Sequence, residues 1–130
     1  MRGRTDSHYW GVVLDAPDAQ ELARFYARLL DWKITKDEPG WATVAPADGV
    51  TYLGFQTSPN YVRPVWPNAD GSQQMMMHLD LEVGDLYGAV THAIETGATL
   101  AAHQPQDDVR VLLDPAGHPF CLYTDSGEDT

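Results

Sequence analysis

The chain has 130 residues, a length that suits one domain, and 43% of them are apolar, which is enough for a buried core and argues against disorder. Eight basic and 19 acidic residues give a formal net charge of −11, which speaks against nucleic-acid and anionic-membrane partners because both bind basic surfaces. A single cysteine excludes an intrachain disulfide, no stretch approaches the roughly 20 apolar residues of a membrane span, and no signal-peptide pattern is present, so we expect a cytoplasmic protein.

The first part of the chain predicts a strand, a helix and three further strands. Tyr9–Ala16 is rich in β-branched and aromatic residues and predicts a strand. Asp18 is a helix N-cap residue, and apolar residues recur at helical spacing from Ala19 to about Leu30. The next three strands are predicted at Trp32–Lys36, Trp41–Ala45 and Thr51–Gln56.

The second part repeats this order after a loop, 58–74, that contains three prolines. Met75–Val83 alternates between apolar and polar residues and predicts a strand with the odd-numbered residues facing the core. Asp85 is the next N-cap residue, and Gly97 suits the end of the helix that follows. The last three strands are predicted at Thr99–His103, Asp108–Leu113 and Phe120–Thr124, with the turn Asp114–Gly117 between the last two.

The chain therefore consists of two strand–helix–strand–strand–strand (βαβββ) modules in tandem, which we expect to form a single domain. The modules are predicted at about 8–57 and 75–125, joined by the linker 58–74 and followed by a polar tail at 126–130. Asp85 lies 67 residues after Asp18, and the same offset aligns Gly11 with His78 and Gly54 with Cys121.

Three segments carry a resemblance to a known family: Asp18–Tyr26 with Leu29–Trp32, His78–Val83, and Asp114–Leu122. Together with the repeat, they resemble the vicinal oxygen chelate superfamily of glyoxalase-like and bleomycin-resistance-like proteins. The resemblance implies an α+β fold in which the two modules form a curved eight-stranded mixed sheet around a cleft, and it implies a homodimer. One departure is Asp31, where the family usually has glycine.

In the metalloenzymes of this superfamily the cleft holds a divalent ion. Carried over by position, the resemblance implies ligand positions at Gly11, Gly54, His78 and Cys121. Glycine has no side chain, so two donors remain, and Glu82 or Gln56 would add a third only in another register. We therefore expect no bound metal and no other cofactor, and we expect the two glycines to widen the cleft.

Three residues are candidates for a catalytic role, and each of them could instead have a purely structural role. His78 and Asp80 share the polar face of one predicted strand and could perform acid–base catalysis, or could be a hydrogen-bonded histidine and a solvated carboxylate. Cys121 could pair with His78 as a nucleophile, or could be a small buried apolar residue.

The spare aromatic residues could stack on a flat ligand, or could pack within the protein or at a dimer interface. Arg110 could hold an anion in the cleft, although a surface ion pair is the simpler account. The predicted ligand-binding set is Gly11, Trp41, Tyr52, Gly54, Gln56, Trp66, His78, Asp80, Arg110 and Cys121.

These observations favour a metal-free binding protein over an enzyme. We expect it to sequester an aromatic or partly apolar small molecule, as the resemblance implies for members that confer antibiotic resistance. The alternative is a glyoxalase-like lyase, isomerase or dioxygenase with an atypical metal site or with metal-free acid–base catalysis. A third hypothesis is a regulatory or scaffolding domain whose cleft is vestigial.

Overall fold

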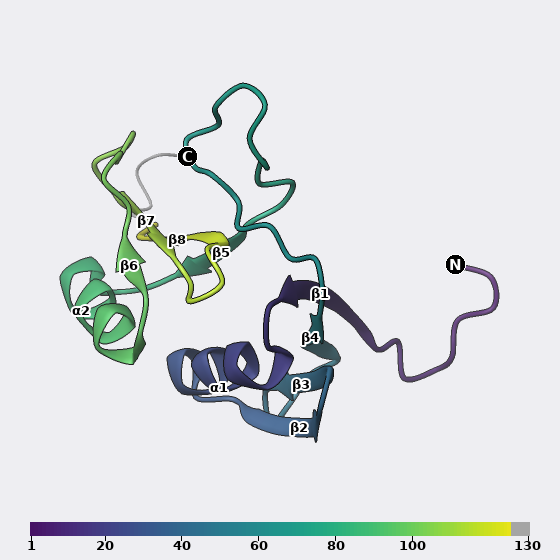
Figure 1. The fold of residues 1–130 in the computed structure, drawn as a ribbon. Helices are drawn as coiled ribbons and strands as arrows, with labels where there is room; N and C mark the ends of the chain where they lie inside the picture. Colours follow the sequence, from purple (N-terminus) through teal and green to yellow (C-terminus); the bar gives the residue numbers. More distant parts are fainter. Residues whose placement is uncertain (126–130) are drawn as a thin grey trace. The chain divides into compact units, whose positions relative to one another are not determined.

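The computed structural model describes residues 1–125, which divide into two compact units after Tyr61 (Figure 1). The predicted tail at 126–130 lies outside the described residues. The first unit contains β1 (Trp10–Ala16), α1 (Ala19–Leu30), β2 (Lys33–Glu38), β3 (Trp41–Ala45) and β4 (Thr51–Thr57). The second contains β5 (Leu79–Glu82), α2 (Leu86–Thr96), β6 (Thr99–Leu100), β7 (Val109–Leu113) and β8 (Pro119–Tyr123).

The two units have the same sheet topology, which confirms the α+β class and the tandem repeat. The strand orders are β1-β4-β3-β2 and β5-β8-β7-β6, with the first strand of each unit parallel to the last and the other pairs antiparallel. Val13 pairs with Gly54, and the residues 67 positions later, Asp80 and Cys121, pair in the same way. Each unit thus contains one four-stranded sheet.

The first helix has the cap residues that the sequence predicts. The Asp18 carboxylate accepts hydrogen bonds from the backbone N–H groups of Gln20 and Glu21, which have no partner inside the helix. The helix ends at Asp31, whose φ of 55° lies in the left-handed region. Glycine adopts this conformation most easily, but aspartate also tolerates it, so the departure from the family pattern leaves the helix end intact.

Each unit has its own core beneath its helix. In the first, Tyr26 of α1 stacks on Phe55 of β4 with ring centroids 5.6 Å apart. In the second, α2 packs on β6, β7 and β8, and Leu112, Phe120 and Leu122 are buried. Because side chains alternate along a strand, Cys121 lies on the opposite face of β8. Neither helix among residues 1–125 is long and apolar enough to cross a bilayer.

Two predicted strands are shorter in the structure. The strand expected at Met75–Val83 is confined to β5, because β5 pairs with β8 and β8 begins at Pro119, which has no N–H to donate. Met77, predicted to face the core, is 69% exposed.

The strand expected at Thr99–His103 ends at Leu100, because beyond this point the Gln104 side chain replaces strand residues as the hydrogen-bond partner of β7. The Gln104 amide donates to the carbonyls of Ala101 and Val111 and accepts from the Val111 N–H. These bonds satisfy backbone groups of β7 that a longer β6 would otherwise pair.

Candidate functional site

The turn between β7 and β8 sets the register of the strands that carry the site. Buried Asp114 accepts hydrogen bonds from the N–H groups of Ala116 and His118, and Gly117 adopts a φ of +94°. The resulting hairpin places Val109 opposite Tyr123 on the face of the sheet that carries Cys121.

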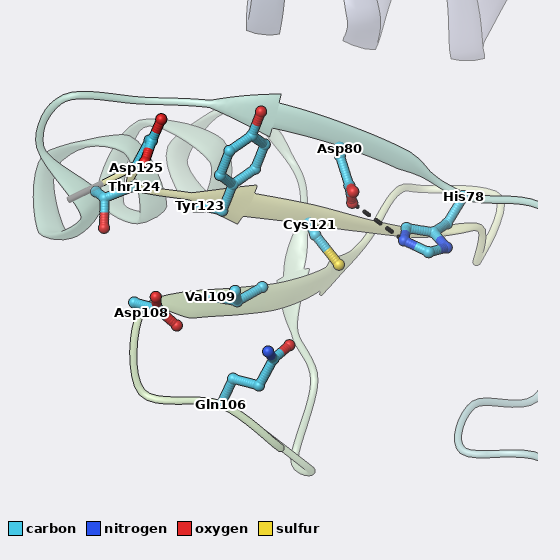
Figure 2. Close-up of a pocket in the computed structure, with 9 residues that line it drawn as sticks. All are labelled: His78, Asp80, Gln106, Asp108, Val109, Cys121, Tyr123, Thr124 and Asp125. Atoms are coloured by element: carbon cyan, nitrogen blue, oxygen red, sulfur yellow. Dashed lines mark ion pairs between the residues drawn. The ribbon is translucent and has the colours of Figure 1, made fainter. Parts of the chain in front are cut away.

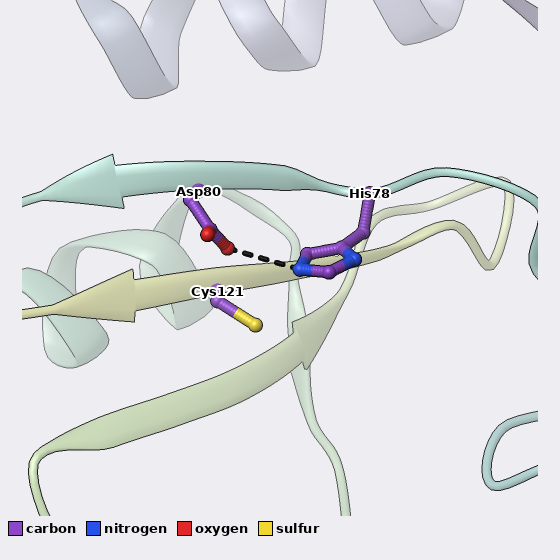
Figure 3. A group of neighbouring side chains, drawn as sticks. All are labelled: His78, Asp80 and Cys121. Atoms are coloured by element: carbon purple, nitrogen blue, oxygen red, sulfur yellow. Dashed lines mark ion pairs between the residues drawn. The ribbon is translucent and has the colours of Figure 1, made fainter.

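His78, Asp80 and Cys121 meet on this face (Figure 3). Asp80 of β5 is the register partner of Cys121 of β8, and His78 comes one residue before β5. The Nε2 atom of His78 lies 3.0 Å from Oδ1 of Asp80, and one donor atom from each of the three residues lies within 4.8 Å of the others. The parallel pairing of β5 with β8 therefore builds a cluster from imidazole, carboxylate and thiol.

The environment of Cys121 keeps its thiol protonated. Burial, followed by the charge of Asp80 and a hydrogen bond to it, raises the pKa of Cys121 from 9.0 to about 11. A thiol with this pKa is a poor nucleophile at neutral pH, because the thiolate is the reactive form. The predicted Cys121–His78 nucleophilic pair therefore lacks an activated thiolate.

The cluster opens onto a cavity of about 400 Å³ in the second unit (Figure 2). Among residues 1–125, its lining includes three carboxylates, those of Asp80, Asp108 and Asp125, and no lysine or arginine. The lining residues in this part of the chain are His78, Asp80, Gln106, Asp108, Val109, Cys121, Tyr123, Thr124 and Asp125. This composition disfavours anionic ligands and leaves Tyr123 and Val109 for apolar contact.

Two predicted ligand-binding residues of the second unit lie away from this cavity. Arg110 shares a strand face with Leu112, and its Nη1 atom donates to the backbone carbonyls of Gln106, Asp107 and Val109. The Trp66 ring lies 5.5 Å from the ring of His103.

The remaining predicted ligand-binding residues share one face of the first sheet. The ring of Tyr52 covers Gly11, where a Cβ atom would come within 2.5 Å of it, and the ring of Trp41 covers Gly54, with a corresponding distance of 2.7 Å. The expectation that the two glycines widen a cleft is therefore wrong, because rings of their own sheet fill the space. Gln56, on the same face, donates a hydrogen bond to Asp15.

Sequence reasoning missed several residues that line the cavity. Val109 could have been placed there, because the predicted turn Asp114–Gly117 fixes which residues of the hairpin face Cys121. The other missed residues lie outside the strands, where alternation predicts no orientation: Gln106, Asp108, Thr124 and Asp125.

The four metal positions implied by the resemblance do not fit the family's ion, because Gly11 and Gly54 offer no donor atom and lie under aromatic rings. The sequence predicts two side chains that could serve as metal ligands, His78 and Cys121. The structure adds Asp80 as a third, because its carboxylate lies within reach of the other two. All three donors belong to the second unit.

Comparison with known proteins identifies the family to which the chain belongs. A sequence profile of the Glyoxalase-like domain matches residues 11–123, so the chain belongs to this family and, through it, to the vicinal oxygen chelate superfamily. None of the curated proteins matches significantly.

Solved structures with the same fold are similar at low sequence identity. One is a glyoxalase/bleomycin resistance protein/dioxygenase family enzyme from Burkholderia phytofirmans PsJN, with a TM-score of 0.63, 19% identity, and coverage of 92% of this chain and 98% of that one. A glyoxalase-related enzyme from Fulvimarina pelagi has a TM-score of 0.64 and 17% identity, and the match covers 91% of this chain and 88% of that one. An integron cassette protein from V. cholerae has a TM-score of 0.61 and 20% identity, and the match covers 95% of this chain and 98% of that one.

Proposed function

We propose that the protein binds a small, partly aromatic molecule in the second-unit cavity and holds it without chemical change. The observation that carries this proposal is the cavity itself. Its volume of about 400 Å³ falls within the roughly 300–1,000 Å³ that is usual for small-molecule sites. Polar groups converge on it from β5, from β8 and from the loop before β7, and such groups fix the orientation of a ligand.

The lining suggests the chemistry of the ligand. Tyr123 provides an aromatic ring, whereas Asp80, Asp108 and Asp125 repel anions. We therefore expect an uncharged or positively charged aromatic compound. Sequestration without reaction is supported by the protonated thiol of Cys121, and it is the behaviour that the resemblance implies for the antibiotic-resistance members of the superfamily.

A ligand screen tests this proposal. Aromatic amines and the matching aromatic carboxylates are compared by ligand-observed NMR, and bound compounds are recovered for mass spectrometry. We expect amines to bind, carboxylates to fail, and recovered ligands to be unchanged. Asp80→Asn should weaken amine binding, whereas Glu38→Gln, an exposed carboxylate in the first unit, should leave it unaltered. Equal binding of both series, or binding indifferent to Asp80→Asn, contradicts the proposal.

A second candidate, metal-free acid–base catalysis by a lyase or isomerase, is favoured by one contact. The 3.0 Å pair between His78 and Asp80 orients the imidazole in the way that a general base requires. Under this hypothesis the recovered ligand is chemically altered, and His78→Ala abolishes the change while binding persists.

A further inference from the structure

We propose that His78, Asp80 and Cys121 bind one Zn²⁺ ion within the second unit. The cluster offers an imidazole nitrogen, a carboxylate oxygen and a sulfur atom, all within 4.8 Å of one another. Zn²⁺ accepts this mixture of donors, whereas Mg²⁺ and Ca²⁺ prefer oxygen donors alone.

The distances require little rearrangement. Bonds of about 2.0–2.3 Å to a tetrahedral zinc ion put ligand atoms about 3.3–3.8 Å apart. His78 Nε2 and Asp80 Oδ1 are 3.0 Å apart, and the largest separation in the cluster is 4.8 Å or less. Rotations of side chains supply shifts of this size, because the side chains of His78 and Asp80 are 39% and 59% exposed.

This site differs from the arrangement that the resemblance implies, in which both modules contribute ligands. Asp80 occupies a position that in the first unit is Val13, and Gly11 and Gly54 replace the other two donors there. All donors thus come from one module, and one of them is a thiol. The proposal reverses the sequence-based expectation of a metal-free protein, which rested on two donors. Three protein ligands leave the fourth tetrahedral position for water or for a bound molecule.

The test uses the full-length protein, reduced and stripped of metal. Zn²⁺ is titrated by calorimetry, and Co²⁺ serves as a spectroscopic probe of the same site. We expect one ion per chain with a Kd of about 1 μM or tighter, and a thiolate-to-cobalt charge-transfer band. Binding at neutral pH should release the thiol proton, so the measured enthalpy should vary with the ionisation enthalpy of the buffer.

Single substitutions test each ligand. Cys121→Ser should abolish the charge-transfer band, and His78→Ala and Asp80→Asn should each weaken Zn²⁺ binding at least about tenfold. Glu82→Gln is the matched control, because Glu82 is a carboxylate of β5 outside the cluster and should be dispensable. Circular dichroism checks that each variant is folded.

Three results would overturn the proposal: no saturable binding of either metal, half an ion per chain, or a charge-transfer band that survives Cys121→Ser. Binding of small molecules is measured separately on metal-stripped protein. A failure to bind Zn²⁺ therefore does not decide whether the cavity binds a small molecule, and the reverse holds as well.

Discussion

Cys121 illustrates how neighbouring residues decide the chemistry of a side chain. Burial and the adjacent Asp80 raise its pKa to about 11, so in the metal-free protein the thiolate fraction at pH 7 is on the order of 10⁻⁴. We predict slow alkylation by iodoacetamide at neutral pH, with a rate that rises towards pH 11. Asp80→Asn should shift the midpoint of the pH–rate profile downward because it removes the negative charge.

The control for this prediction is the same protein unfolded in guanidinium chloride, where the midpoint should return to the ordinary range of a cysteine thiol. A midpoint near 9 in the folded wild-type protein would show that neither burial nor Asp80 acts on the thiol.

The same shift has a consequence for stability. Because the folded state binds the Cys121 proton more tightly than the unfolded state does, this group contributes stability that is fully present below pH 9.0 and is lost as the pH rises towards about 11. We predict that the free energy of unfolding of metal-free protein falls more steeply over this interval in the wild type than in Cys121→Ser. Urea unfolding at a series of pH values measures the difference, and parallel curves would contradict it.

At the scale of elements, a glycine of β1 lies under an aromatic ring of its register partner on β4. A Cβ atom at Gly11 would come within 2.5–2.6 Å of the Tyr52 ring, so Gly11→Ala forces the ring to move. We predict that this substitution costs about 1–3 kcal/mol of stability, as overpacking usually does. In a Tyr52→Ala background the cost should largely disappear, which a double-mutant cycle by urea unfolding measures. Additive effects would show that the ring does not restrict this position.

The alternation of side chains along strands explains what sequence could predict of these elements. It placed His78 and Asp80 on one face, and the Asp18 and Asp85 caps fixed both helix starts. Alternation fails to predict burial where the neighbouring strands decide which residues are covered. Trp10 alternates with Val12, a pattern that predicts a core position, yet Trp10 is 52% exposed at the first position of β1.

Site geometry was harder to predict than the fold. Asp80 is the third member of the cluster because the register of β5 on β8 places it opposite Cys121. The alternation of residues within a strand does not determine that register. The position of Arg110 depends on a loop whose carbonyls it binds, and Gln104 ends β6 through its side chain. These features depend on particular long-range or loop contacts, whereas the repeat, the caps and the turn are local patterns.

At the scale of the whole molecule, the two modules share one topology but differ in chemistry. The positions of His78, Asp80 and Cys121 correspond to Gly11, Val13 and Gly54, and both sets lie on the face of the sheet away from the helix. The buried aromatic rings Tyr26, Phe55 and Phe120 lie on the other face, beneath the helices. One module can therefore carry a polar site while the other fills the same face with aromatic rings.

The edges of the two sheets bear on assembly. Within the first unit β1 hydrogen-bonds to β4 alone, and within the second unit β5 hydrogen-bonds to β8 alone. On β1, Trp10 and Val13 are 52% and 42% exposed. An open edge strand with apolar side chains is a template for pairing with another chain unless charge or proline blocks it.

We therefore predict that the protein is a homodimer in solution, with twice the 14.4 kDa chain mass by light scattering. Val13→Lys should weaken the dimer, because a charge on an open edge disfavours pairing. Ile34→Lys, at an exposed position of β2 on the opposite edge of the same sheet, is the matched control and should leave the dimer intact. A monomeric mass at all concentrations would exclude the dimer, and dissociation by Ile34→Lys alone would move the interface from β1 to β2.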